Sequence, residues 1–111
     1  MNEPMYHPTT PEIAAQRKDL APEIHDAFDA FTHAVFADGA LPVKTKQLIA
    51  VAVAHTTQCP YCIQGHTRLA SREGASPQEI MEAIWVAAEM RAGAAYAHST
   101  LALYALAHQH S

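Results

Sequence analysis

Apolar residues recur at helical spacing along most of this chain. The clearest case is a series at intervals of four, three and four residues: Ile24, Phe28, Phe31 and Val35. This spacing places the four side chains on one face of an amphipathic helix. We expect that helix to begin at Pro22 and to end at Asp38-Gly39, because glycine is favoured just past a helix end.

The next apolar segment has no polar face. Residues 48–54 read Leu-Ile-Ala-Val-Ala-Val-Ala, which is apolar on every side of a helix. We expect a helix from Pro42 to about Thr57, with its middle at the centre of the domain or of an oligomer interface.

The remaining helices are indicated by prolines, caps and apolar faces. We expect one at about 11–19 and one at about 60–73 ended by Gly74. We expect a fifth from Pro77, with Ile80, Ile84, Ala87 or Ala88, and Met90 facing inward and with Gly93 as its end or kink. We expect a last one with Ala97, Leu101, Tyr104 and Ala107 on one face. Ser76 and Glu79 have the spacing of a capping box before the fifth helix. No segment alternates with period two. The sequence therefore predicts an all-α bundle of five to six helices, a single domain over 1–111 with its core at about 20–107, an irregular segment 1–10 and a frayed tail 108–111.

Composition and charge limit the classes of partner and the cellular location that we expect for this protein. The net charge is −4 and no lysine and arginine cluster is present, so we expect no nucleic-acid partner. The apolar run 48–54 is too short to span a membrane, and no basic-plus-apolar leader begins the chain, so a cytoplasmic location is expected. Half of the residues are apolar and 16% are charged, which indicates surface buried against other copies in a homo-oligomer.

The only two cysteines carry the candidate chemistry. Cys59, Cys62 and His66 fall at i, i+3 and i+7, on one face of a helix. A thiol beside an imidazole can be held as a thiolate, and a second thiol can form a disulfide with it. Spacing alone leaves open which cysteine attacks. The neighbouring His66 favours Cys62 as the attacking thiol and Cys59 as its resolving partner.

Other interpretations of this segment remain open. The cysteines can be inert core residues with His66 at the surface. His55, Cys59, Cys62 and His66 also read H-x3-C-x2-C-x3-H, a zinc-like set, although four ligands on adjoining turns do not easily surround a tetrahedral ion. Cys-Pro-Tyr-Cys occurs in glutaredoxins, but there it follows a strand, and here it follows a long helix. Tyr61 either donates a hydrogen bond to a sulfur or substrate oxygen, or packs at the entrance. We expect no cofactor and no resident metal.

Three segments together resemble a known family. Residues 41–50 (Leu-Pro-Val-Lys-Thr-Lys-Gln-Leu-Ile-Ala), residues 57–63 followed by His66, and residues 74–80 (Gly-Ala-Ser-Pro-Gln-Glu-Ile) resemble the alkylhydroperoxidase D-like branch of the carboxymuconolactone decarboxylase family. The resemblance covers about residues 20–95. It is specific because the lysine-rich helix start, the fixed gap and C-x-x-C-x-x-x-H occur together in an all-α context.

The resemblance implies an all-helical fold assembled as trimers or hexamers, with weak peroxidase or disulfide reductase activity of the peroxiredoxin type. It implies that Cys62 is peroxidatic, that Cys59 resolves it and that His66 belongs to a proton relay. The substrate would be a hydroperoxide. The reductant would be a thiol or a lipoyl group, since the alkylhydroperoxidase D proteins are reduced by a lipoylated protein.

One position departs from the family pattern. The family has a glutamate twelve residues before the first cysteine, and this chain has Gln47, which keeps the hydrogen-bond geometry but cannot take up a proton. We hypothesise that His55, one turn before Cys59, partly replaces the missing base; the alternative is a histidine hydrogen-bonded at a helix end or interface. Two other functions stay open: a lactone decarboxylase-like lyase, which needs no cysteine pair, and a redox-sensing or metal-binding module without turnover.

Overall fold

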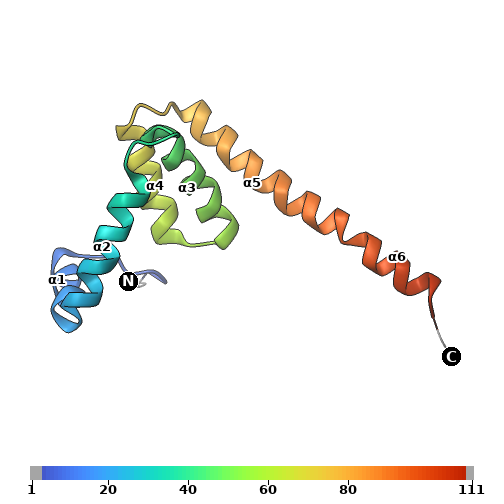
Figure 1. Ribbon diagram of the computed structural model, residues 1–111, viewed down its shortest axis with the longest axis horizontal. Coiled ribbons are helices and arrows are strands. Elements are labelled where there is room, and N and C mark those ends of the chain that lie inside the picture. The colour runs from blue at the N-terminus through green and yellow to red at the C-terminus, as the bar shows by residue number, and fades with distance from the viewer. Residues whose placement is uncertain (1–3, 110–111) are drawn as a thin grey trace. The chain divides into compact units, whose positions relative to one another are not determined.

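The computed structural model describes residues 4–109, and these form helices and no strand (Figure 1). The helices are α1 (Pro11–Leu20), α2 (Pro22–Phe36), α3 (Val43–Thr57), α4 (Pro60–Arg72), α5 (Pro77–Ala97) and α6 (Ser99–Ala107). The predicted all-α class is confirmed. The described chain forms two compact units, one up to Val43 and one from Lys44. The prediction of a single domain stays a prediction.

The two ends of the chain are described only in part. Residues 4–10 contain no helix, as expected for the irregular segment, and residues 108 and 109 follow the end of α6. Positions 1–3 of the predicted irregular segment and positions 110–111 of the predicted tail lie outside the described residues. No helix of residues 4–109 is both long enough and apolar enough to cross a membrane.

The first unit contains α1 and α2, and both begin as the sequence predicts. The Thr10 hydroxyl accepts a hydrogen bond from the Ile13 N–H at 3.2 Å, and Pro11 occupies the first turn of α1. Pro22 likewise occupies the first turn of α2. The apolar face of α2 is present, but its large side chains remain exposed: Ile24, Phe28, Phe31 and Val35. This face is therefore available for packing.

The second unit holds its small core between α3, α4 and the start of α5. Val51 and Ala70 are fully buried and Ala75 nearly so; the partly buried side chains packed against them are Leu48, Ile80 and Ile84. The predicted central position of α3 is correct for one of its sides, where Gln47, Val51 and Ala54 are buried. Its other side, with Ile49 and Val53, is about half exposed.

A polar network joins the first turns of α3 and α5. Ser76 and Glu79 form the predicted capping box, with Ser76 Oγ accepting from the Glu79 N–H at 3.1 Å and Glu79 Oε1 accepting from the Ser76 N–H at 2.9 Å. Lys44 Nζ lies 2.8 Å from Glu79 Oε2. The cap of α5 thus also anchors the beginning of α3.

Two predictions about α5 are wrong in detail. Gly93 does not end the helix, which continues to Ala97 before a break at His98. One glycine costs a helix only about 1 kcal/mol relative to alanine, so the surrounding turns continue through it. Met90 does not face inward: it is 62% exposed, because the core contacts of α5 lie nearer its start.

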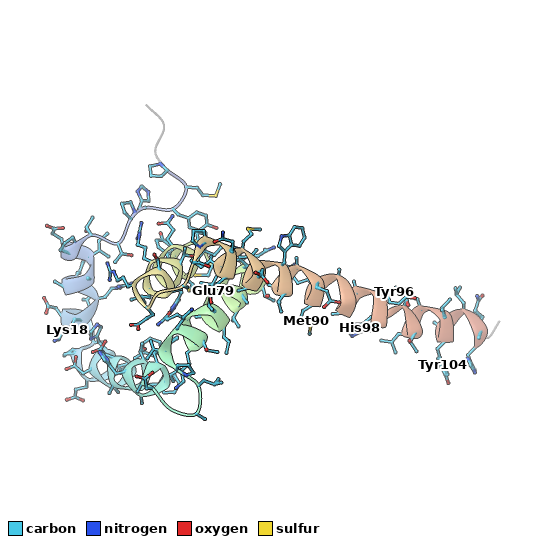
Figure 2. The ribbon with its side chains drawn as sticks, turned by 90° about the horizontal axis from the view of Figure 1, so that it is seen from above. Lys18, Glu79, Met90, Tyr96, His98 and Tyr104 are labelled. Atoms are coloured by element: carbon cyan, nitrogen blue, oxygen red, sulfur yellow. The ribbon has the colours of Figure 1, made fainter. Side chains whose placement is uncertain are left out.

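The last helix is apolar and uncovered. Figure 1 shows α5 and α6 leading away from α3 and α4, and every residue of α6 is exposed. In Figure 2, Met90, Tyr96 and Tyr104 project from α5 and α6 with no other helix of the same unit beside them. Leucines add to this surface at Leu101, Leu103 and Leu106.

Candidate active site

The candidate site is built on the short connection between α3 and α4. Gln58 takes a left-handed conformation, with φ of 58°, and the Cys59 N–H donates to the Ala54 carbonyl at 3.1 Å. This is the hydrogen bond of a Schellman motif, which ends α3 sharply. Pro60 then fixes the first turn of α4. Two residues therefore suffice to reverse the chain and to place Cys59 at the start of α4.

Cys59 is the N-cap of α4. Its backbone is extended, and its sulfur accepts a hydrogen bond from the Cys62 N–H at 3.3 Å. The first N–H groups of a helix have no partner inside the helix and carry the positive end of its dipole. The sulfur of Cys59 therefore lies where a negative charge is favoured.

The two thiols are free, half-buried and hydrogen-bonded to each other. The pKa of Cys59 is lowered, chiefly because the Cys62 side chain donates to it, and further by the backbone N–H groups of Cys62 and Tyr61. The pKa of Cys62 is raised because its thiol is that donor, because it is partly desolvated and because the Cys59 charge is close. The Cys59 sulfur is therefore the more favourable site for a negative charge.

His66 pairs with Gln47 from the facing helix. Gln47 Oε1 lies 2.7 Å from His66 Nδ1. An amide oxygen can only accept, so Nδ1 carries the proton, and in the neutral ring Nε2 holds the lone pair. Gln47 is 4% exposed, which shields this hydrogen bond from water. The pair is a base at Nε2 whose orientation is fixed at Nδ1 by a neutral group.

His55 and Tyr61 have more local contacts. His55 Nδ1 lies 2.8 Å from the carbonyl of Val51, one turn back on α3, and therefore donates to it. This is the helix-end hydrogen bond of the alternative interpretation, and the role of His55 as a substitute base stays a hypothesis. Tyr61 is 48% exposed, and its backbone N–H contributes to the environment of the Cys59 sulfur.

The structure thus brings the predicted residues together as two pairs, Cys59 with Cys62 and Gln47 with His66. Residues 4–109 contain no group of three or more His, Cys, Asp or Glu side chains arranged to hold a metal ion, so the zinc-like spacing has no matching geometry. Sequence reasoning missed the cap hydrogen bond from the Cys62 N–H to the Cys59 sulfur. The signal for it was Pro60, which marks the residue before it as the cap.

This arrangement can perform reversible thiol chemistry. A thiolate at the start of α4 can attack an electrophilic oxygen or sulfur, and the neighbouring thiol can close a disulfide with it. The imidazole Nε2 can accept or return the proton that these steps move. Each of these functions uses a group that the structure places within α3, α4 or their connection.

Comparison with known proteins agrees with the motif. The model of the family described as the carboxymuconolactone decarboxylase family matches residues 22–105. A protein of Paracoccus denitrificans named uncharacterized protein 4 in cox locus is 70% identical over 83 residues, which cover 75% of each chain.

Solved structures show the same similarity. The apo form of a carboxymuconolactone decarboxylase family protein from Legionella pneumophila is 36% identical, with a TM-score of 0.67 over 69% of each chain. A family member from Thermotoga maritima, described as a candidate for involvement in an antioxidative response, is 35% identical. Its TM-score is 0.56, and the match covers 59% of this chain and 67% of that one.

Proposed function

This chain belongs to the carboxymuconolactone decarboxylase family, and we propose that within it the protein is a peroxiredoxin-type, thiol-dependent oxidoreductase that reduces hydroperoxides. The reaction uses the Cys59–Cys62 pair with the help of His66. The observation that carries the proposal is the hydrogen-bonded thiol pair at the start of α4, with a lowered pKa for one sulfur and a raised pKa for the other. The antioxidative description of the Thermotoga maritima relative supports the same class of reaction.

The proposed reaction oxidises the cysteine pair to a disulfide in two steps, and a third step reduces the disulfide again. One thiolate attacks the terminal peroxide oxygen, becomes a sulfenic acid and releases an alcohol or water once a proton is supplied. The second sulfur attacks the sulfenic sulfur, hydroxide leaves and is protonated to water, and a disulfide remains. A dithiol such as a lipoyl group, or two monothiols, then reduces the disulfide by exchange and is itself oxidised.

The location and the reductant follow from the same chemistry. We place the protein in the cytosol, where cellular reductants keep cysteine pairs in the reduced, dithiol state. No hydrophobic or charged cofactor pocket is needed, because the electrons come from an exchanging thiol.

The test is rapid-mixing oxidation of the reduced protein by hydrogen peroxide and by cumene hydroperoxide. The loss of free thiol is measured in samples quenched at successive times. Turnover is measured with dihydrolipoamide as the reductant. The expected result is disulfide formation much faster than oxidation of free cysteine, with turnover that requires both cysteines. The Cys59→Ser/Cys62→Ser double variant is the matched control. Oxidation no faster than free cysteine would overturn the proposal and favour the lyase, whereas one fast oxidation without turnover would favour redox sensing.

We also propose that the protein works as a homo-oligomer, a trimer or a hexamer. The supporting observation is the surface of α5 and α6, where Tyr96 is 82% exposed and Leu101, Leu103 and Tyr104 are 63–65% exposed. Burying one such side chain stabilises an assembly by about 1.5–3 kcal/mol. A helix that is apolar on every side is a buried helix in most proteins.

Sedimentation equilibrium tests this assembly. Leu101→Glu places a charge within the apolar surface and is expected to lower the mass toward that of one chain of 12.0 kDa. Gln109→Glu adds the same charge beyond α6 and should leave the mass unchanged. A wild-type protein that sediments as a monomer at high concentration would contradict the proposal.

A further inference from the structure

We propose that Cys59 is the attacking sulfur of this protein and that Cys62 resolves the intermediate, the reverse of the order that the family resemblance implies. This inference rests on the proposed thiol chemistry and assigns its first step. It follows from two features of the site: the donors around the Cys59 sulfur and the neutral partner of His66.

The donors around the two sulfurs are unequal. The Cys59 sulfur accepts from the Cys62 N–H at 3.3 Å and is also approached by the Tyr61 N–H and the Cys62 thiol. It stands at the N-cap, where the positive end of the α4 dipole is strongest. Cys62 lies one turn inside the helix and acts as a donor to Cys59. A negative charge on Cys59 is stabilised by the Cys62 and Tyr61 N–H groups and the Cys62 thiol, whereas a negative charge on Cys62 is stabilised by its own backbone N–H.

For Cys62 to attack first, a base must remove its proton. His66 is the base one turn further along α4. Its Nδ1–H donates to the amide oxygen of Gln47 at 2.7 Å, so the imidazolium formed by proton uptake would face a neutral group in a buried position. A carboxylate at position 47 would stabilise that imidazolium. This chain thus has an amide in place of a carboxylate at position 47 and keeps the helix start that favours Cys59.

The proposed order also uses the proton of the Cys62 thiol. The Cys59 thiolate attacks the peroxide and becomes the sulfenic acid, while the alkoxide that leaves takes the Cys62 thiol proton and departs as alcohol. Cys62 is then the thiolate that the second step requires. It attacks the Cys59 sulfur, and the hydroxide that leaves is protonated by solvent. The products are one disulfide, one alcohol and one water.

Site-resolved alkylation tests the assignment on the full-length reduced protein. Substoichiometric iodoacetamide is added between pH 5.5 and 9.5, and tandem mass spectrometry locates the label, because Pro60 and Tyr61 separate the two cysteines in fragment spectra. We expect a several-fold excess of label on Cys59 at neutral pH. An excess on Cys62 would overturn the proposal.

Two matched variants isolate the thiol–thiol hydrogen bond. Cys62→Ser keeps a side-chain donor next to Cys59, and Cys62→Ala removes it. We expect the pH midpoint for Cys59 alkylation to be higher in the alanine variant. Equal midpoints would show that the Cys62 side chain does not hold the charge on Cys59.

Dimedone trapping after peroxide links the assignment to catalysis. We expect a sulfenic acid adduct on Cys59 in Cys62→Ser, and a much slower reaction at Cys62 in Cys59→Ser. The reverse pattern, with fast disulfide formation in the wild type, would refute the proposed order and leave the peroxidase proposal intact. Preferential alkylation of Cys59 without any peroxide reaction would refute the peroxidase proposal and keep the order of attack for disulfide substrates.

Discussion

Replacing Gln47 by glutamate should speed the reaction that begins at Cys62 about tenfold and transfer part of the reactivity to Cys62. Gln47 is the buried acceptor for His66 Nδ1–H at 2.7 Å. The substitution Gln47→Glu preserves the length of the side chain and the accepting oxygen, and it adds a charge. The only intended change is therefore the electrostatic support of the imidazolium.

The magnitude follows from the hydrogen bond. A neutral hydrogen bond contributes about 0.5–1.5 kcal/mol, and one to a charged group contributes about 1.5–3 kcal/mol. The carboxylate therefore stabilises protonated His66 by about 1–1.5 kcal/mol more than the amide does. Because about 1.4 kcal/mol corresponds to a factor of ten in rate, proton transfer from Cys62 to His66 becomes about tenfold more favourable. The buried carboxylate should also destabilise the fold by about 1–3 kcal/mol when His66 is neutral.

The assay is rapid-mixing oxidation by hydrogen peroxide at several pH values, with alkylation mapping on the same samples. Gln47→Met is the control, since it fills a similar volume and cannot accept the hydrogen bond. We expect this variant to be no faster than the wild type, because it leaves His66 Nδ1–H without its acceptor. Circular dichroism establishes that each variant retains its helices.

The reasoning would be refuted by a folded Gln47→Glu protein in which the rate of reaction at Cys62 stays within twofold of the wild type across the pH range. It would also be refuted if Gln47→Met accelerated the reaction equally, because the effect would then come from loosened packing. An accelerated reaction with all label still on Cys59 would show that position 47 acts without engaging Cys62.

Three further predictions concern stability and are measured by urea denaturation. Val51→Ala should destabilise the protein by about 1.5–3 kcal/mol, since Val51 is fully buried and loses two methyl groups. Ser76→Ala should cost about 1 kcal/mol by removing the α5 cap; an unchanged midpoint would contradict it. The pKa of Glu79 is lowered, chiefly by Lys44, so its contribution is present above the ordinary carboxyl range and is lost as pH falls through the lowered pKa. Wild type and Lys44→Gln should therefore converge in stability at acidic pH, and a constant difference would rule this out.

Much of the fold could be predicted because local chemistry sets the helix boundaries. Thr10 before Pro11 and the Ser76–Glu79 box mark helix starts through hydrogen bonds within four residues. Gly93 was misjudged because helix continuation depends on all the surrounding turns. Met90 was misjudged because an apolar side chain at helical spacing indicates a face and does not identify what covers it.

For the candidate site too, the sequence predicts some contacts and leaves others undetermined. The proximity of Cys59 and Cys62 follows from helical spacing, since residues three apart are neighbours. The pairing of Gln47 with His66 joins two helices, and only the family resemblance pointed to it before the structure showed the hydrogen bond. The hydrogen bond from the Cys62 N–H to the Cys59 sulfur depends on which backbone N–H groups remain unpaired at the start of α4, and helical spacing carries no information on that.

The cap at Cys59 also affects the redox equilibrium. A sulfur held in a disulfide loses the charge that the Cys62 and Tyr61 N–H groups favour. The helix start therefore stabilises the dithiol more than the disulfide, which raises the reduction potential of the pair. Oxidation also weakens the first turn of α4, so backbone amides there should exchange faster with solvent in the oxidised protein. A disulfide formed between Cys59 and Cys62 should therefore be readily reduced by small dithiols.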